Sequence, residues 1–212
     1  MIRVTSVNVG KAETLEGPNR IFVTGINKKP TAETVAVEEL GLRNDAVCDA
    51  RYHGGSDQAV YLYRQEDYAW WSKELGRDIG AGMFGDNLTV EGLEGPALMV
   101  GDCLRFPDLE LQVTAPRIPC ATLAAQMGSP EFVSAYIQAE RPGIYLRVTR
   151  TGSVTAGDEI ELVPYDRSSI STVTFFRDIQ RKLTGDEIRR YLELPIDIRT
   201  RTDLQNRLKK AQ

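Results

Sequence analysis

Hydrophobic and polar residues alternate along short stretches of the first 164 residues, and this period of two predicts β-strands. The alternation is strict over residues 109–115 and again over residues 144–149. The side chains expected on the buried faces are Leu109, Leu111, Val113, Ala115, Ile144, Leu146 and Val148. Residues 60–63 and 21–24 are rich in the β-branched and aromatic types that favour strands. Many short strands at this spacing predict a closed or strongly curved sheet.

Gly-Asp pairs occur at residues 85–86, 101–102 and 157–158, and such pairs are typical of turns. The second and third pairs each precede a short apolar stretch, at residues 103–106 and 159–163. These stretches are therefore predicted to be strands that follow tight turns.

Two helices are predicted within the strand-rich part. Residues 66–75 place Tyr68, Trp71 and Leu75 at helical spacing, and Gly76 is a suitable C-terminal stop. The second helix is expected to run to about residue 139, with Ser129 as its cap and Pro130 in its first position.

The pattern changes after Pro164, where three short helices are the simplest prediction. Residues 170–183 read as a strand leading into a helix. Thr184 and Glu187 have the spacing of a capping box, and Ile188, Tyr191 and Leu192 follow on one face. Residues 202–210 place Leu204 and Leu208 four positions apart. We therefore divide the chain into residues 1–164 and 165–212.

Composition indicates an ordinary globular protein, because 42% of the 212 residues are hydrophobic and 26% are charged. No apolar run is long enough for a membrane span, the N-terminus lacks the apolar core of a signal peptide, and three scattered cysteines do not suggest a disulfide framework. We therefore expect a cytoplasmic protein without a membrane partner.

The 15 basic and 23 acidic residues of 1–164 give a net charge of −8, whereas 11 basic and 7 acidic residues give 165–212 a charge of +4. Because acids are interleaved with the bases, this region is read as solvated helix rather than a nucleic-acid-binding tail.

Two segments carry candidate chemistry. His53, the only histidine, precedes Gly54 and Gly55, and adjacent glycines allow a turn whose N–H groups bind an anion. A tight hairpin with a surface histidine explains the same residues. Cys120 follows two prolines and lies three residues from Arg117, whose charge is expected to lower the thiol pKa. Such a thiolate suits a soft metal or a persulfide, and a small buried cysteine is the equally weighted alternative.

The other candidate sites are weaker. Cys48 and Cys103 lie in strand-like or turn segments and are assigned to packing. The chain shows no zinc-ligand spacing and no nucleophile elbow for a serine triad. Asn87 follows a Gly-Asp turn and reads by itself as a turn-capping amide.

Taken together, six segments resemble the MOSC family, the domain named for the C-terminal part of molybdenum cofactor sulfurases. The resemblance covers most of the chain and is specific because the segments follow one another in family order. They are Gly41-Leu42-Arg43-Asn44-Asp45, His53-Gly54-Gly55-Ser56-Asp57-Gln58-Ala59-Val60-Tyr61, Phe84-Gly85-Asp86-Asn87-Leu88-Thr89, Gly101-Asp102, Pro116-Arg117-Ile118-Pro119-Cys120 and Gly143-Ile144-Tyr145. The chain is most similar to stand-alone bacterial members with a three-helix C-terminal extension.

The resemblance implies an α+β fold, in which a MOSC-type β-barrel is followed by a small three-helix region. It also implies a molybdenum-cofactor-dependent oxidoreductase that reduces N-hydroxylated compounds such as hydroxylaminopurine-like bases and amidoximes, with a detoxifying role. Cys120 would be the catalytic residue and the molybdenum ligand. The residues implied to bind the molybdopterin are Arg117, His53, Gly54, Gly55, Asp57, Asn87 and Tyr145. The expected partners are a small N-hydroxylated substrate and a separate electron-donor protein, with a homodimer as a candidate assembly.

Two positions depart from the family pattern. Asn44 stands where glycine is usual, and asparagine tolerates a positive φ better than most residues. Gln58 stands where lysine is common, so phosphate binding here would rest on other groups.

Two other functions fit the same residues. A sulfur carrier would hold a persulfide on Cys120 without a bound pterin. A non-catalytic module would bind an anionic small molecule and use residues 165–212 to dock a partner, and the sequence does not separate these alternatives.

Overall fold

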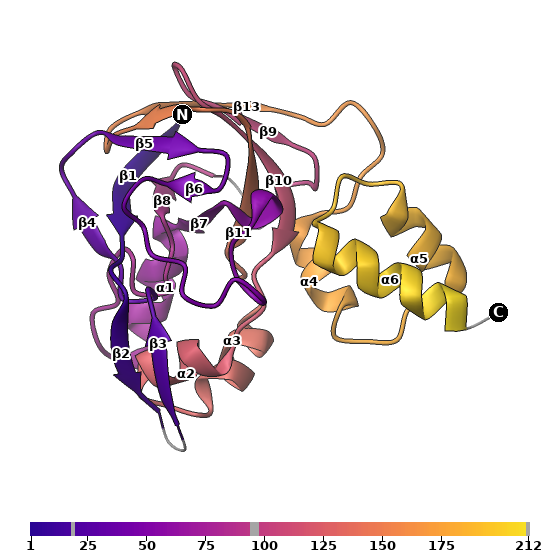
Figure 1. Cartoon of the computed structure of the whole chain (residues 1–212), viewed down its shortest axis with the longest axis horizontal. Helices are drawn as coiled ribbons and strands as arrows, with labels where there is room; N and C mark the ends of the chain where they lie inside the picture. The colour runs from indigo at the N-terminus through magenta and orange to yellow at the C-terminus, as the bar shows by residue number, and fades with distance from the viewer. Residues whose placement is uncertain (18–19, 94–97, 211–212) are drawn as a thin grey trace.

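The computed structural model describes residues 1–17, 20–93 and 98–210, and within these ranges seven strands close into a β-barrel (Figure 1). The strand order is β13-β9-β10-β11-β7-β8-β1, and β13 also pairs with β1. Only the β7–β8 pair is parallel among these strands. The barrel strands are β1 (Ile2–Val9), β7 (Val60–Arg64), β8 (Leu88–Glu91), β9 (Cys103–Arg105), β10 (Glu110–Pro116), β11 (Ile144–Arg150) and β13 (Glu159–Val163). The closed sheet and the α+β class are confirmed.

The remaining elements surround this barrel. Strand β4 (Lys29–Thr31) pairs with β1, whereas β12 (Gly152–Val154), β5 (Val35–Glu38) and β6 (Gly41–Leu42) form a small sheet. Strands β2 (Glu13–Glu16) and β3 (Ile21–Thr24) form a hairpin. The helices of the described residues are α1 (Gln65–Leu75), α2 (Ala121–Met127), α3 (Phe132–Ala139), α4 (Thr172–Asp178), α5 (Gly185–Leu192), α6 (Ile198–Lys210) and a short 3-10 helix, η1 (Ser56–Gln58).

The alternation along β7 divides the hydrophobic residues between two cores. Val60 and Leu62 are fully buried inside the barrel, whereas Tyr61 and Tyr63 point into a second, aromatic core outside it. Successive side chains of a strand lie on opposite faces, so one strand supplies both cores. The outer core is what positions the helices next to the barrel.

Strand β10 differs from the prediction at its C-terminal end. Leu109, Leu111 and Val113 pack inside the barrel as expected, but Ala115 belongs to the outer core. The pairing of β10 with β11 shifts register between Val113 and Ala115. A bulge inserts one extra residue and reverses the direction of the side chains that follow, which strict alternation does not reveal.

The first predicted helix is confirmed, and Gly76 ends it in the left-handed conformation with φ 62°. The second, α3, begins at Phe132 rather than at Pro130, because residues 130–131 form a turn before it. Ser129 bonds the Glu131 carboxylate instead of capping a backbone N–H. Helix α2 was not predicted.

The three C-terminal helices are confirmed, including the capping box between Thr184 and Glu187 at the start of α5. The strand expected near residue 170 is reduced to one bridge, between Met99 and Ser171. The Ser171 side chain caps α4 by accepting from the Thr174 N–H, so the helix begins at once.

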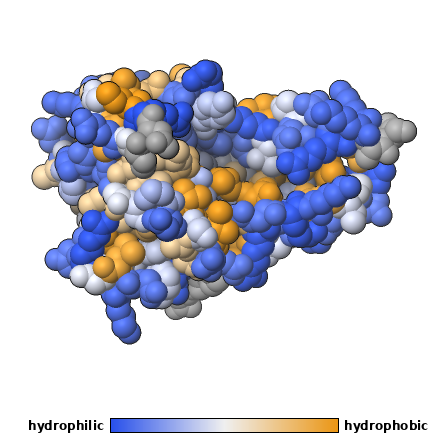
Figure 2. Space-filling model, turned by 90° about the horizontal axis from the view of Figure 1, so that it is seen from below, coloured by the Kyte–Doolittle hydropathy of each residue, from blue (hydrophilic) through white to orange (hydrophobic). Residues whose placement is uncertain are grey.

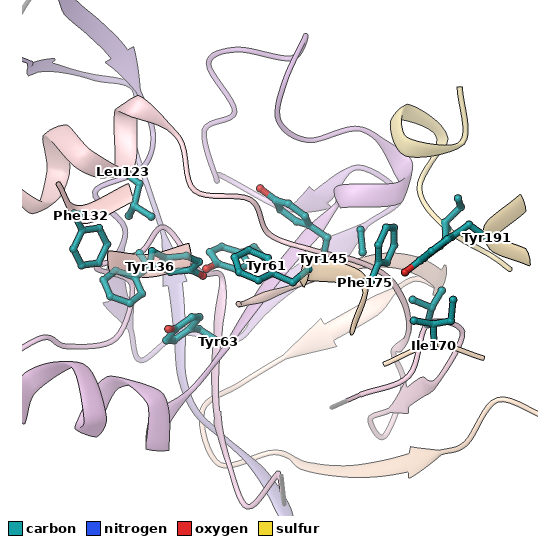
Figure 3. Close-up of a cluster of buried hydrophobic side chains, with 14 of the residues drawn as sticks. Tyr61, Tyr63, Leu123, Phe132, Tyr136, Tyr145, Ile170, Phe175 and Tyr191 are labelled. Carbon is teal, nitrogen blue, oxygen red and sulfur yellow. The ribbon is translucent and has the colours of Figure 1, made fainter. Parts of the chain in front are cut away.

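The C-terminal helices pack on the barrel through the outer core. Tyr136, Tyr61, Tyr145, Phe175 and Tyr191 all belong to this core and extend from the barrel to the C-terminal helices (Figure 3). On the surface, Arg177 of α4 pairs with Glu140. Seen from below, hydrophobic residues gather near the middle of the molecule, whereas the C-terminal helices are mostly hydrophilic (Figure 2). Among the described helices, none combines the length and the apolar character needed to cross a membrane.

Candidate functional site

A pocket of about 590 Å³ opens between the β2–β3 hairpin, the segment 45–54 and the segment 117–122. Its interior wall contains Arg117, Cys120 and Tyr145. Its rim contains the exposed apolar side chains of Ile21 and Val23 and the exposed ring of Tyr52. The pocket therefore combines a polar floor with an apolar mouth, as small-molecule sites commonly do.

Arg117 is a buried cation in this wall, with 5% of its surface exposed. Its Nη1 donates to the Phe84 carbonyl oxygen at 2.8 Å, and its Cζ lies 4.8 Å from the centre of the Tyr61 ring. Burial lowers the pKa of the guanidinium, but Tyr145, Tyr61 and Cys120 raise it by more, so Arg117 stays cationic. Among the described residues, its Nε finds no hydrogen-bond acceptor.

Helix α1 positions the backbone that receives Arg117. Tyr68 of α1 donates its hydroxyl to the buried Asp86 carboxylate and accepts from the Phe84 N–H at 3.0 Å. Gly85 between them has φ 81°, and a Cβ there would lie 3.5 Å from Arg117 Nη1 and 3.0 Å from Ile26. A glycine is therefore needed where the turn passes the guanidinium.

Cys120 is the residue immediately before α2, and Arg117 Nη2 lies 3.9 Å from its Sγ. Burial raises the pKa of this thiol, but a hydrogen bond from His53, the charge of Arg117 and the Leu123 N–H outweigh it. The result is a Cys120 pKa of about 6. Cys120 is therefore mostly a thiolate at neutral pH, which is the nucleophilic and metal-binding form.

The turn after His53 depends on glycine. Gly54 and Gly55 have φ values of 68° and 86°, and a Cβ on Gly54 would lie 2.8 Å from Val47. Both values lie where glycine is favoured. The turn therefore brings His53 and Gly54 to the pocket wall near Cys120.

A buried ion pair forms another part of the wall. Lys28 contacts both oxygens of the Asp45 carboxylate, and each side chain is 7% exposed. Asn87 donates to Asp45 at 2.9 Å and accepts from the Tyr61 N–H at 3.1 Å. Asn87 thus ties the ion pair to β7. Asn44, which precedes Asp45, has φ 67°, so the turn that usually needs glycine is kept.

The pocket brings together most of the predicted site residues. Those that line it are His53, Gly54, Asn87, Arg117, Cys120 and Tyr145. Gly55 and Asp57 are not among the lining residues. The Asp57 carboxylate instead pairs with Arg147 and accepts from the Ile198 N–H at 2.7 Å.

The assignment of Cys48 to packing is wrong, because this residue is exposed and lines the pocket. The chain around Cys48 is a loop along the rim, not a strand that would cover it. Cys103 in β9 is half-buried, as expected of a packing residue.

Sequence reasoning also missed Lys28 and the β2–β3 hairpin as parts of the site. Lys28 lies in a polar turn that has no motif, and only the tertiary structure places it against Asp45. No group of three or more His, Cys, Asp or Glu side chains suited to a metal ion is present in the described ranges.

We expect Cys120 to be alkylated by neutral iodoacetamide with a rate that rises around pH 6. The thiol is protonated below its pKa of about 6 and reacts as the thiolate above it, whereas the ordinary value is 9.0. Cys48 and Cys103 serve as internal references, because partial burial raises the pKa of both. Alkylation of each peptide is followed by mass spectrometry, and equal pH profiles for Cys120 and Cys48 would contradict the assignment.

Comparison with known proteins assigns the chain to a family. The sequence profile of the MOSC domain matches residues 49–161, which include His53, Asn87, Arg117, Cys120 and Tyr145. The chain belongs to the MOSC domain family. This MOSC chain is 37% identical to the YflK protein of Bacillus subtilis, over 79% of this chain and 76% of that protein. It is 32% identical to the YiiM protein of Escherichia coli, over 64% of this chain and 60% of that protein.

Solved structures show the same fold. The crystal structure of YiiM from Geobacillus stearothermophilus has a TM-score of 0.81 and 28% identity, and the match covers 98% of this MOSC chain and 100% of that one. The structure of Escherichia coli YiiM has a TM-score of 0.78, with 100% and 94% covered, and its 22% identity supports the fold alone. A Gibberella moniliformis protein named as a reductase is 32% identical over 57% of this chain and 23% of its own length.

Proposed function

We propose that this MOSC protein binds a molybdenum cofactor in the pocket and reduces N-hydroxylated compounds there, with the Cys120 thiolate as a ligand of molybdenum. The observation that carries the proposal is a thiolate with a pKa of about 6 beside a buried guanidinium, in a pocket of about 590 Å³. MOSC domains are associated with molybdenum cofactor binding, and a relative over part of the chain is named as a reductase.

The residues present fit an anionic cofactor. Arg117 Nε is a buried donor without an acceptor in the described part of the chain, and Arg117 lines the pocket. An unpaired buried donor is costly, and a ligand oxygen would relieve that cost. The guanidinium would also give a charge-assisted grip on a phosphate or a polarised pterin oxygen. The turn at Gly54 has no side chain to keep such a ligand away.

Cys120 fits the metal for a chemical reason. Thiolate sulfur is soft and electron-rich. Soft ligands suit molybdenum, which the pterin would also hold through sulfur atoms. Arg117 and His53 keep Cys120 deprotonated at neutral pH, so the ligand does not need a base to become available. Ala121 and Thr122, which follow it, line the same wall.

The apolar rim would receive the body of the substrate. Ile21 and Val23 are 68% and 66% exposed, and Tyr52 is 67% exposed. Burial of an aromatic ring against them would exclude water from the polar floor. The bound cofactor supplies two-electron oxygen-atom transfer, so that an N–OH group, two electrons and two protons give an N–H group and water. A separate redox protein is the proposed source of the electrons.

The test is the molybdenum and pterin content of protein purified from cells that make the cofactor. We expect close to one molybdenum and one pterin per chain. Arg117→Met removes the buried cation, and the loss of charged hydrogen bonds should weaken cofactor binding by about 10- to 100-fold. The matched control is Arg105→Met, because Arg105 forms a half-exposed pair with Glu110 away from the pocket.

Two outcomes would count against the proposal. Wild-type protein free of molybdenum and pterin, purified gently from competent cells, would contradict it. A mass increase of about 32 Da on Cys120 in that protein would then favour the sulfur carrier if dithiothreitol removes it, because a sulfinic acid adds about the same mass and is not reduced. Equal cofactor retention by Arg117→Met and the wild type would remove Arg117 from the binding site.

A further inference from the structure

One arginine of the last helix reaches the loop that carries His53. Arg199 is in the first turn of α6, whose N-terminal end faces the barrel (Figure 1). Its Nη1 donates to the Gly54 carbonyl oxygen at 2.9 Å and to Gln58 Oε1 at 2.8 Å. Its Nη2 donates to the Ala50 carbonyl oxygen at 2.9 Å and to that of His53 at 3.3 Å. One guanidinium thus binds four acceptors within residues 50–58.

A second set of contacts also joins the segment 50–58 to the start of α6. Asp57 accepts from the Ile198 N–H at 2.7 Å and pairs with Arg147 at 3.1 Å. Arg147 also donates to the carbonyl oxygens of Pro195 and Ile196, just before α6. Asp57 does not line the pocket because its carboxylate binds Ile198 and Arg147, and these contacts anchor the loop to α6.

The loop needs such support. Its own backbone hydrogen bonds are short-range, from Tyr52 and His53 to Asp49 and from Gln58 to Gly55. Two adjacent glycines with positive φ lose much conformational freedom when they are ordered. Contacts from outside the loop therefore decide how well it is held.

We propose that Arg199 is a positioning residue of the site, which holds the segment 50–58 so that His53 stays in the pocket wall beside Cys120. The three-helix region then helps to form the pocket, because α6 supports one loop of its wall. The inference rests on the proposed function for the role of the pocket, but its test needs no cofactor. Lysine at position 199 would carry the charge on a single nitrogen. A single nitrogen cannot donate all four hydrogen bonds that the planar guanidinium of Arg199 makes.

The test follows the imidazole signals of His53 by NMR at one fixed neutral pH. His53 is the only histidine, so its ring signals are assigned without ambiguity. Four cofactor-free proteins are compared: the wild type, Cys120→Ala, Arg199→Ala and the double variant. Cys120→Ala should shift the imidazole signals in the wild-type background. We expect this shift to fall to less than half in the Arg199→Ala background, and to recover in part with Arg199→Lys.

The matched control is Arg207→Ala, because Arg207 lies on the same helix and pairs with Asp203, one turn away on α6, at 2.8 Å. This variant should keep the full effect of Cys120→Ala. Amide exchange should accelerate in residues 50–58 of Arg199→Ala and stay unchanged in β7 and β10. If Arg199→Ala does not fold, Arg199→Lys supports the same comparison.

An equal Cys120→Ala shift with and without Arg199 would overturn the inference and leave Arg199 as a simple link between helix and barrel. Because none of these measurements uses molybdenum or substrate, a failure of the proposed reductase activity would not be mistaken for a failure of this inference.

Discussion

Replacing Cys120 by alanine should reduce turnover of an N-hydroxylated substrate by at least about 100-fold and remove bound molybdenum. Loss of groups that merely support a metal ligand already costs about 10- to 100-fold, and here the ligand itself is removed. Cys120→Ser should fail as well, because a serine hydroxyl does not ionise near neutral pH and is a harder ligand. The measurements are steady-state reduction with an electron donor, and metal content.

The matched control is Cys103→Ala, which removes a half-buried thiol of β9 that does not line the pocket. Its activity should equal that of the wild type. Thermal unfolding of Cys120→Ala should stay close to that of the wild type, because Cys120 is only partly buried. Full reductase activity in folded Cys120→Ala would refute the role of Cys120.

Trp71→Ala should lower the free energy of unfolding by about 3–5 kcal/mol. Trp71 is 1% exposed in the outer core, and its ring packs at centroid distances of 5.0 Å from Phe132 and 6.0 Å from Tyr136. Its Nε1 also donates to the Tyr63 hydroxyl at 2.9 Å. The substitution therefore leaves a cavity and a lost hydrogen bond, a large loss against a typical total stability of about 5–15 kcal/mol.

Denaturant unfolding followed by circular dichroism measures this loss. The matched control is the adjacent Trp70→Ala, because Trp70 is only partly buried, with Arg141 Cζ 4.6 Å from its ring centre. We expect a clearly smaller loss for Trp70→Ala. Equal losses for the two variants would contradict the expectation that burial in the outer core makes Trp71 the larger contributor to stability.

The strands and helices were predictable where one local signal dominated. Residues 144–149 alternate, and Ile144 and Leu146 are buried in the barrel. The capping box at Thr184 is a contact between neighbours in sequence, so it could be read directly. The bulge in β10 was not predictable, because one extra residue leaves the alternation of residue types unchanged while it turns Ala115 to the other core.

The site was predictable in part. The approach of Arg117 to Cys120 follows from a separation of three residues in a segment stiffened by two prolines. The place of Cys48 at the rim did not follow, because a small residue in a short loop has no periodic pattern. Arg199 lies 146 positions after His53, and nothing local connects the two.

Residue patterns along the chain were enough to predict the strand-rich barrel, its turns, the three C-terminal helices and the segments that resemble a MOSC domain. Each of these depends on residue types at short, regular spacing. Three features depend on contacts between distant parts of the chain: the Cys120 pKa of about 6, the Lys28–Asp45 ion pair and the contacts of Arg199 with the His53 loop. Burial and charge act through space, and closing the barrel brings together groups that are far apart along the chain, so no local pattern reveals these features.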